Sequence, residues 1–533
     1  MLSSLLRKLT LLVALVFWLL APGATASASP TGIMFVPLDN RPVCCDYPAA
    51  VLQAAGYKIY MPPEKLLAGR NTPADTEALW KWLEKKVDNC KAAVISTDAL
   101  IYGGLVASRT HQLTETELTA RVSRLENLPL DKNIKVYAFS TLMRTPVSSF
   151  GNVEPEYYSR LGPAIYKYSG LADEIDANDA SFRDELISRA IERNIDRIPL
   201  SDWLTRRDKN MTVNRSLAQM ARQGRFHYFA IGKDDNAPLS HTHMEARKLS
   251  MNNMDVPDRD FQILPGVDQL GLLLLTRAVN ELEGTSPRIY LKYVEGVGED
   301  TIPQYSDQPL SKSVPQQIIA AGGQLAGSLM DSDVVLALNT PPNGEMEDST
   351  SNSNMYFASP ANRRYLTSLK QILDQGHKVS LADVAYSNGA DNGFMNELAI
   401  RGLLERLVAY NGWNTADNAI GFAIAQGMLA PKIKDRDRLQ LLRERVIDDW
   451  FYQSNARRTV TDQLEKAHLS GAKYNLNTNL RMVQQNTNQI CQNMALHYDL
   501  TRRTTFNITF PWNRLFEINV ANMKTKKAPG RNN

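Results

Sequence analysis

Cysteine and histidine are scarce in this chain, and their scarcity excludes several kinds of site. Four cysteines among 533 residues are too few for a fold held together by disulfides, and they lack the paired CxxC spacing of a zinc site. Cys44 and Cys45 are adjacent and do not easily bridge each other, so one bridge from this pair to Cys90 is an open alternative. We interpret all four, including Cys491, as structural residues.

The chain also lacks the common signatures of nucleotide binding and of serine hydrolases. It has no Walker loop and no GxSxG elbow, and the glycine pair in IIAAGGQLAG does not match a dinucleotide fingerprint. The formal net charge of +3 is nearly balanced, which gives no electrostatic reason to expect nucleic acid as a partner. We therefore expect no cofactor and no nucleic-acid partner.

Long apolar runs are missing except at the N-terminus. There Arg7 and Lys8 precede the apolar run Leu9–Ala21, and small residues around Ala26 and Ala28 fit a cleavage site. The run is shorter than the ~20 residues that a spanning helix needs, although an uncleaved anchor is the alternative. We predict a signal peptide over residues 1–28 and a secreted, periplasmic or cell-surface protein without stable membrane insertion after cleavage.

The remainder alternates short apolar runs with amphipathic segments, which indicates parallel strands joined by helical crossovers. The predicted fold class is α/β, either barrel-like or a doubly wound, mostly parallel sheet, with a helical C-terminal domain. The expected strands are Ile33–Pro37, Lys58–Met61, Ala92–Ser96, Lys135–Phe139, Phe226–Ile231, Phe261–Leu264, Arg288–Tyr293, Val334–Leu338 and Val379–Ala382. The expected helices include Asp75–Val87, Glu115–Leu128 and Leu270–Leu282.

Two stretches depart from this alternation of strands and helices, and they set the predicted domain boundaries. Residues 150–222 lack a clear strand and read as a helical insertion near the cleft of an α/β core that spans residues 30–430. Residues 431–500 are expected to form a helical domain. Residues 501–533 read as a β-like terminal segment, a hairpin or an edge strand, followed by a basic tail.

Polar residues gather after the predicted strands. The clusters are MFVPLDNRP, VISTDALIYGG, YAFSTLMRTP, YFAIGKDDNAP, ILPGVDQ, VLALNTPP and SLADVAYSNGAD. A helix N-cap explains any one of them, but seven together favour a ligand cleft, because ligands bind outside the carboxyl ends of parallel strands. The candidate substrate-binding residues are Asp39, Arg41, Asp98, Tyr102, Arg144, Asp268, Asn339, Asp383, Asn388, Asp391, Trp413 and Asn414.

Asp234 and Asp235 are the candidate catalytic pair. If both point into the cleft, mutual repulsion raises the pKa of one, which yields an acid and an anion from the same residue type. The plainer alternative is one N-cap and one solvated aspartate. Arg41 and Arg144 suit a carboxylate or polyhydroxylated ligand but equally suit structural ion pairs, and Trp413 is either a plate for a sugar ring or a core residue.

A metal centre is the competing interpretation. Among seven histidines only His241 and His243 are close, in an HxH pair that follows a proline in a predicted loop. An all-oxygen magnesium or calcium site is the other open alternative; its candidate ligands are Asp39, Asp98, Asp234 and Asp383. We predict no metal site from these residues.

Several motifs resemble those of the bacterial family catalogued as Domain of Unknown Function 4127. They are PLDNRP, STDALIYGGLVASR, STLMRTP, DDNAP, PGVDQLG, DVAYSNGAD, GWNTADNAIG and the terminal PWNR, and they extend from about residue 33 to 520. One departure is Gln269, where the family pattern implies an acidic residue, which leaves Asp268 as the better candidate. The family name implies no activity.

A more distant likeness is to the β-N-acetylglucosaminidases of the O-GlcNAcase type, through a paired aspartate followed later by a Trp-Asn segment. That resemblance implies a barrel in which Asp234 orients an acetamido group, Asp235 is the general acid, and Trp413 and Asn414 line the sugar site.

Together these patterns favour an exported hydrolase, with a glycosidase first, acting on a glycan or small-molecule substrate through the paired aspartates. The alternatives are a metal-dependent hydrolase of phosphate or amide bonds and a non-catalytic solute-binding protein.

Overall fold

The computed structural model describes residues 31–128, 133–149 and 151–525. The predicted signal peptide and most of the basic tail lie outside the described residues.

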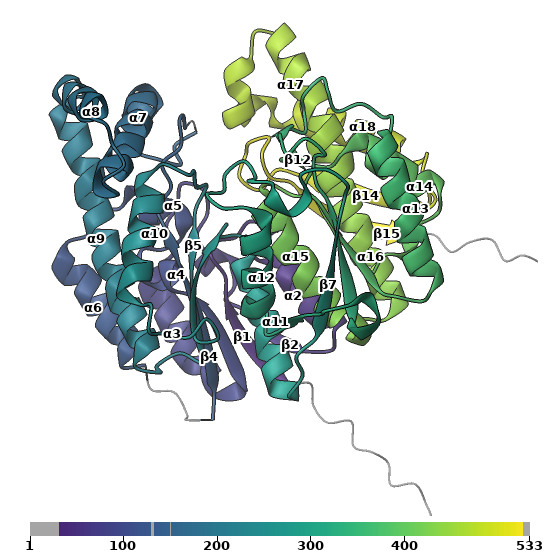
Figure 1. Cartoon of the computed structure of the whole chain (residues 1–533), viewed down its shortest axis with the longest axis horizontal. Helices are drawn as coiled ribbons and strands as arrows, with labels where there is room; N and C mark the ends of the chain where they lie inside the picture. Colours follow the sequence, from purple (N-terminus) through teal and green to yellow (C-terminus); the bar gives the residue numbers. More distant parts are fainter. Residues whose placement is uncertain (1–30, 129–132, 150, 526–533) are drawn as a thin grey trace, which may run out of the picture. The chain divides into compact units, whose positions relative to one another are not determined.

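The first sheet contains six parallel strands in the order β2-β1-β3-β4-β5-β6. Their bounds are β1 Gly32–Val36, β2 Lys58–Tyr60, β3 Ala92–Ser96, β4 Lys135–Leu142, β5 Tyr228–Lys233 and β6 Phe261–Pro265. Most residues of β1, β3, β4, β5 and β6 are buried, because helices cover both faces of the sheet (Figure 1). This burial on both faces explains why these strands read as continuous apolar runs.

The second sheet contains five parallel strands in the order β13-β11-β9-β7-β8. Their bounds are β7 Arg288–Tyr293, β8 Gln324–Leu325, β9 Val334–Asn339, β11 Val379–Asp383 and β13 Ala409–Asn411. Read from β8 to β13 and numbered along the chain, the strands of this sheet come in the order second, first, third, fourth, fifth. The first five strands of the other sheet, read from β2, have the same order. The predicted α/β class is confirmed, as two open doubly wound sheets; the described strands form no closed barrel.

Helices α2 and α11 pack on the first sheet, and α12 and α15 pack on the second and against α11. The bounds of the helices up to the second sheet are α2 Asp46–Ala54, α3 Thr76–Lys86, α4 Thr97–Ile101, α5 Leu105–Thr110, α6 Glu115–Glu126, α7 Tyr158–Asp176, α8 Phe182–Asn194, α9 Arg197–Arg222, α10 His241–Asn252 and α11 Leu270–Glu283. The later helices are α12 Leu310–Ala320, α13 Pro360–Asp374, α14 Asn392–Ile400, α15 Ala416–Leu429, α16 Asp435–Arg445, α17 Arg457–Lys466 and α18 Leu480–Ala495.

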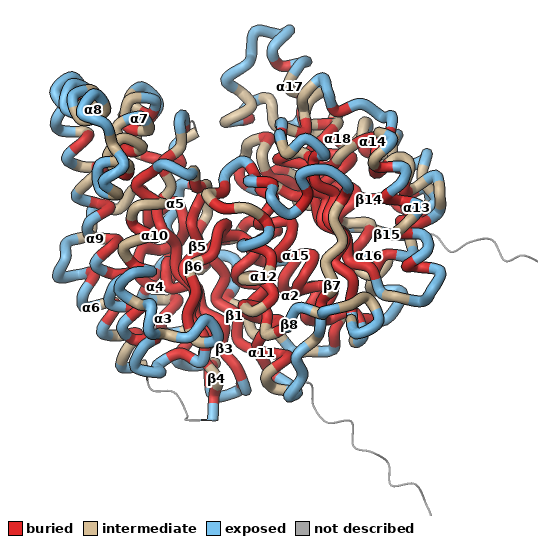
Figure 2. Tube along the Cα trace, viewed as in Figure 1, coloured by how far each residue is buried: buried red, intermediate tan, exposed pale blue. Residues whose placement is uncertain are grey.

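One hydrophobic core joins the two sheets. It contains Phe35 and Phe139 from the first sheet, Leu272 from α11, Ile420 from α15 and Leu336 from the second sheet, all of them buried. Figure 2 shows this continuous buried interior along the strands and the helices between them. The two sheets therefore share apolar contacts rather than forming separate lobes, and burial of this kind is the main driving force for their association.

Helices α7, α8 and α9 fill the connection between β4 and β5. After α15 the chain is helical through α18, with a π-helical segment Val446–Ala456 between α16 and α17. The β-like terminal segment forms a hairpin of the antiparallel strands β14 Thr504–Thr509 and β15 Asn519–Thr525, which is one of its two expected forms. Two short strands, β10 Glu347–Asp348 and β12 Tyr386–Ser387, pair with each other near the carboxyl ends of the second sheet. Within the described ranges, no helix has the length and apolarity needed to cross a membrane.

Candidate functional site

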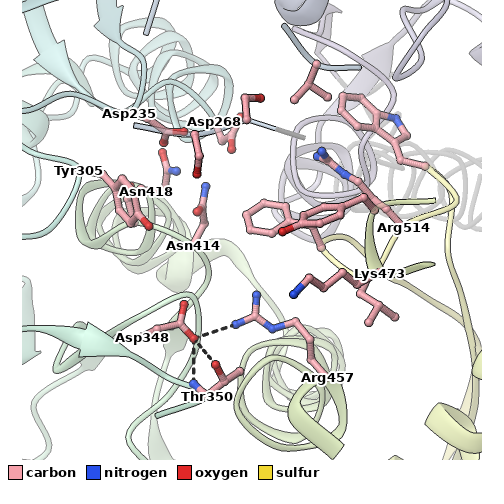
Figure 3. Close-up of a pocket in the computed structure, with 18 of the residues that line it drawn as sticks. Asp235, Asp268, Tyr305, Asp348, Thr350, Asn414, Asn418, Arg457, Lys473 and Arg514 are labelled. Carbon is pink, nitrogen blue, oxygen red and sulfur yellow. Dashed lines mark hydrogen bonds and ion pairs between the residues drawn. The ribbon is translucent and has the colours of Figure 1, made fainter. Parts of the chain in front are cut away.

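A cavity of about 910 Å³ lies at the carboxyl ends of the strands of both sheets. Loops that follow β1, β4, β5 and β6 form one part of its wall, and loops that follow β7, β10 and β13 form another. The C-terminal segment completes it, through α17 and the turn between β14 and β15. This is the position at which doubly wound sheets bind ligands. Figure 3 shows side chains from these loops around an open centre.

Asp234 and Asp235 follow directly after β5, and both line the cavity. Asp234 is buried, and its Oδ2 accepts hydrogen bonds from Arg109, at 3.0 Å from Nε and 2.6 Å from Nη2. Burial raises the pKa of Asp234 to about 6, and repulsion from Asp235 adds to this effect against the attraction of Arg109.

Asp235 differs from its neighbour in backbone and in exposure. Its φ of 32° lies in the left-handed region that non-glycine residues rarely adopt. Its side chain is 24% exposed, and its Oδ2 lies 2.5 Å from Nη1 of Arg144. The tight turn after β5 thus presents one buried and one accessible carboxylate to the same cavity.

Arg41 joins the loops after β1 and β6. Its guanidinium bonds Asp39 through Nε at 3.0 Å and Asp268 through Nη2 at 2.5 Å and Nη1 at 3.1 Å. Cys44 Sγ lies 3.3 Å from both Nη2 of Arg41 and Oδ1 of Asp268. Because Arg41 is almost fully buried and held by two carboxylates, its orientation is fixed before any ligand arrives.

Glu154 is a site residue that the sequence did not identify. It is buried, and its Oε1 accepts from Nε of Arg144 at 2.6 Å and from Nη1 of Arg109 at 3.3 Å. It therefore links the arginines that hold Asp234 and Asp235. The only signal was an acidic residue ten positions after Arg144, in a region without a predicted strand.

The C-terminal contribution to the cavity was also missed, although PWNR was recognised as a motif. Trp512 Nε1 donates to Oδ1 of Asn40 at 2.8 Å, and the guanidinium of Arg41 lies 5.1 Å from the Trp512 ring centroid. Arg514 stacks on the same ring at 5.0 Å and is paired with Glu517. The loop after β1 thus meets the last hairpin of the chain.

The structure places Arg41, Arg144, Asp234, Asp235, Asp268 and Asn414 around this cavity. Asp39, Asp98 and Tyr102 lie buried outside its lining. Asp98 accepts a hydrogen bond from Thr141 at 2.9 Å, and burial raises its pKa to about 7.

Asn339, Asp383 and Asp391 form a different cluster at the ends of β9 and β11. Asn339 Nδ2 donates to Oδ1 of Asp383 at 2.8 Å, and the backbone N–H of Asp391 donates to Oδ2 of Asp383 at 2.9 Å. Burial, with repulsion from Asp391, raises the pKa of Asp383 to about 8. Asp391 caps α14, because its Oδ1 accepts from the N–H of Phe394. These predicted substrate-binding residues therefore organise the loop rather than line the cavity.

Trp413 does not line the cavity, as it would have to if its ring stacked on a sugar. Its side chain is 2% exposed, belongs to the shared hydrophobic core and packs edge-on against Phe516. Its neighbour Asn414 lines the cavity with a φ of 61°, and the Asn414 carbonyl accepts from the N–H of Asn388 at 2.7 Å. Asn388 thus supports a cavity residue without lining the cavity.

The two histidines of the competing metal interpretation have separate partners. His241 Nδ1 lies 3.0 Å from Oγ of Ser169, whereas His243 Nδ1 lies 2.6 Å from Oδ2 of Asp173. Across the described residues, no three His, Cys, Asp or Glu side chains are grouped to hold a metal ion. All four cysteines are free and buried, so the disulfide considered between the Cys44–Cys45 pair and Cys90 is not formed.

A family model described as "Protein of unknown function (DUF4127)" matches residues 33–521. The chain belongs to this family. The match covers all the family motifs quoted from the sequence, including those that surround the cavity of this DUF4127 protein. Gln269, the departure from the family pattern, is fully buried, and its Nε2 donates to the carbonyl of Pro265 at 2.8 Å. Searches of curated proteins and of solved structures found no significant match, and the likeness to O-GlcNAcase is not supported.

Proposed function

We propose that this DUF4127 protein is an exported hydrolase of glycosidic bonds that uses Asp234 and Asp235 as its carboxylate pair. The observation that carries the proposal is the difference between these neighbours, which line one cavity. Asp234 has a pKa raised to about 6 by burial, whereas Asp235 is more exposed and lies beside Arg144. Glycoside hydrolysis needs such a pair, one carboxyl protonated and one ionised.

The contacts suggest which residue has which role. Both Arg109 bonds fall on Oδ2 of Asp234, which leaves Oδ1 as the oxygen able to carry a transferable proton. In this proposal Asp234 donates that proton to the leaving oxygen, and anionic Asp235 accepts a proton from the attacking water. These roles reverse those implied by the O-GlcNAcase likeness.

A screen of chromogenic glycosides and chromogenic phosphate esters tests this proposal. We expect turnover of at least one glycoside, with loss of about 100-fold or more in Asp234→Asn and in Asp235→Asn, the size expected for losing general acid–base catalysis. Asp258→Asn, an exposed aspartate outside the cavity lining, is the matched control and should keep full activity. Cleavage of phosphate esters alone, or full glycosidase activity in both site variants, refutes the proposal.

A non-catalytic solute-binding protein is the second candidate, and it is favoured by one observation: the loops of two sheets with the same strand order line one cavity. The shared core argues against the hinged lobes expected of such a protein, since closing and opening would break contacts between α11 and α15. Under this alternative, sugars bind without turnover, and Asp235→Asn leaves their affinity nearly unchanged.

A further inference from the structure

The cations that line the cavity fall into two groups with different partners. Those of the first group are held by buried carboxyl groups: Arg41 by Asp268 at 2.5 Å, Arg109 by Asp234 at 2.6 Å, Arg144 by Glu154 at 2.6 Å, and Arg514 by Glu517. Close, desolvated pairs of this kind are strong and leave little attraction for a ligand. Their role is to hold the carboxylates in position.

The second group comprises Arg457, Arg458 and Lys473, which we name the basic wall. Figure 3 shows Arg457 and Lys473 across the open centre from Asp235 and Asp268. Arg457 and Arg458 are the first two residues of α17, and Lys473 lies in the short helix Ser470–Tyr474 that follows it.

The pairings of the basic wall are longer and more exposed. Lys473 Nζ is 3.6 Å from Oε1 of Glu465, whose side chain is 51% exposed. Arg457 Nη2 is 3.4 Å from Oδ1 of Asp348, whose side chain is 42% exposed. The Arg457 side chain is 12% exposed, and its other bonds go to neutral groups, the carbonyls of Gln453 and Asn388, each at 3.2 Å. Solvent screens such pairs, so an incoming anion is able to compete for these cations.

Arg458 is held by neutral groups, Oδ1 of Asn352 and the carbonyl of Ser351. Two carboxylates of α17, Asp462 and Glu465, also line the cavity. The net charge of this side of the cavity therefore does not attract an anion by itself, and an anion binds only where it can contact the cations directly. A ligand anion must reach Arg457 and Lys473 while its neutral part lies toward Asp235.

We propose, building on the proposed function, that the substrate is a glycan whose sugar carries an anionic group, a carboxylate or a phosphate, which binds the basic wall. Lys473 and Arg457 bind the anion, and the neutral part of the sugar extends toward the aspartate pair. The cavity of about 910 Å³ has room for this arrangement, because ligand sites commonly measure ~300–1,000 Å³.

Titration of matched sugars tests this proposal without requiring turnover. The probes are glucose, galactose and mannose, each compared with its uronate and its 6-phosphate, with binding followed by calorimetry. We expect one anionic form to bind at least about tenfold more tightly than its neutral partner, a ratio that corresponds to about 1.4 kcal/mol. Comparison of the uronate with the phosphate identifies the anion.

Variants of the basic wall give the second measurement. Lys473→Gln should weaken the preference for the anionic form, since Arg457 remains, and should leave neutral-sugar affinity unchanged. Lys473→Arg should retain the full preference. Lys466→Gln, at an exposed lysine that ends α17 outside the cavity lining, is the control and should bind as the wild type does.

Equal affinity for neutral and anionic sugars, no binding of any probe, or an equal loss for both forms in Lys473→Gln overturns the anion site. Failure of the proposed function is a separate result. It appears as absent glycoside cleavage in the activity screen, while the titrations still decide whether the basic wall binds an anion.

Discussion

The indole N–H of Trp512 donates to the side-chain oxygen of Asn40 at 2.8 Å, although these residues are 472 positions apart in the chain. Asn40 belongs to the loop after β1, and Trp512 belongs to the turn between β14 and β15. Arg70 supports the same turn by donating to the Trp512 carbonyl at 3.1 Å. The first and last motifs of the chain therefore hold each other at the edge of the cavity.

Replacing Trp512 with phenylalanine should separate the hydrogen bond from the packing. Trp512→Phe removes the donor but keeps an aromatic ring for Arg41, so we expect the free energy of unfolding to fall by about 1 kcal/mol. Trp512→Ala should cost roughly 3 kcal/mol or more, as for other buried aromatic residues. Urea denaturation measures both, and Trp82→Phe, at a half-buried tryptophan outside the cavity lining, is the control. Equal effects of the two Trp512 variants contradict this division.

Glu154 should prove essential for stability and for the proposed activity. Glu154→Gln removes the buried charge shared by Arg109 and Arg144, so we expect a loss of roughly 2 kcal/mol or more in unfolding free energy. Turnover in the glycoside screen should fall as the two arginines reorient. Glu156→Gln, at an exposed position two residues away, should change neither quantity. A Glu154→Gln protein as stable as the wild type refutes the linking role.

The pKa of Asp234 predicts the alkaline side of the pH profile. In the proposed role of general acid, Asp234 must be protonated, and its pKa is raised to about 6. Activity should therefore decline as pH rises through about 6, by about tenfold per pH unit once the acid is mostly ionised. The measurement is kcat/KM between pH 4 and pH 9. A rise in kcat/KM across this range means that Asp234 acts as a base instead.

The raised pKa of Asp383 predicts that the stability of the fold depends on pH, in a more alkaline range than the activity does. Its pKa is about 8 in the folded protein, above the value of ~3.9 for an unfolded chain. The folded state therefore binds its proton more tightly, and this contribution to stability is complete below pH ~3.9 and is lost as pH rises through 8. Urea denaturation at pH 5.5 and pH 8.5 should show lower stability at pH 8.5, with a smaller difference in Asp383→Asn. If the stability difference between the two pH values is the same in Asp383→Asn as in the wild type, the pH dependence comes from other carboxyl groups.

The cysteines give a direct chemical count. All four are free and buried, so a thiol reagent should label none rapidly in the native protein and four after unfolding in guanidinium. Detection of only two thiols in unfolded, unreduced protein means that one disulfide has formed, contrary to the structure.

Each of the nine predicted strands corresponds to an observed one, and most were predictable because burial on both faces leaves continuous apolar runs; β2 and β7 are less buried. β8 and β13 were missed, because β8 is two exposed residues, Gln324–Leu325, and β13, Ala409–Asn411, is three residues that end in an asparagine. Pattern also located the cavity loops after β1, β4, β5 and β6. It could not separate Asp268, which lines the cavity, from Asp383, which does not, since each belongs to a polar cluster after a predicted strand.

The remaining site residues depend on contacts between distant segments. Glu154 becomes significant only when Arg109 and Arg144 converge on it, and no local pattern reports that convergence. Lys473 lies in the short helix Ser470–Tyr474, which lines the cavity only because the C-terminal helices fold back over it. Trp413 was predicted to line the site but lies in the core, because a Gly-Trp-Asn sequence does not reveal which side chain faces the core.

The hydrophobic core shared by the two sheets should make the two halves of the chain depend on each other. A break in the exposed connection between α11 and β7, near Thr285, would leave one complete parallel sheet on each fragment. Each fragment would also expose the apolar face of a helix, α11 on one and α15 on the other, that normally packs against its counterpart. Separately expressed, the fragments should aggregate; expressed together, they should assemble into one particle, much as the subunits of an obligate heterodimer do.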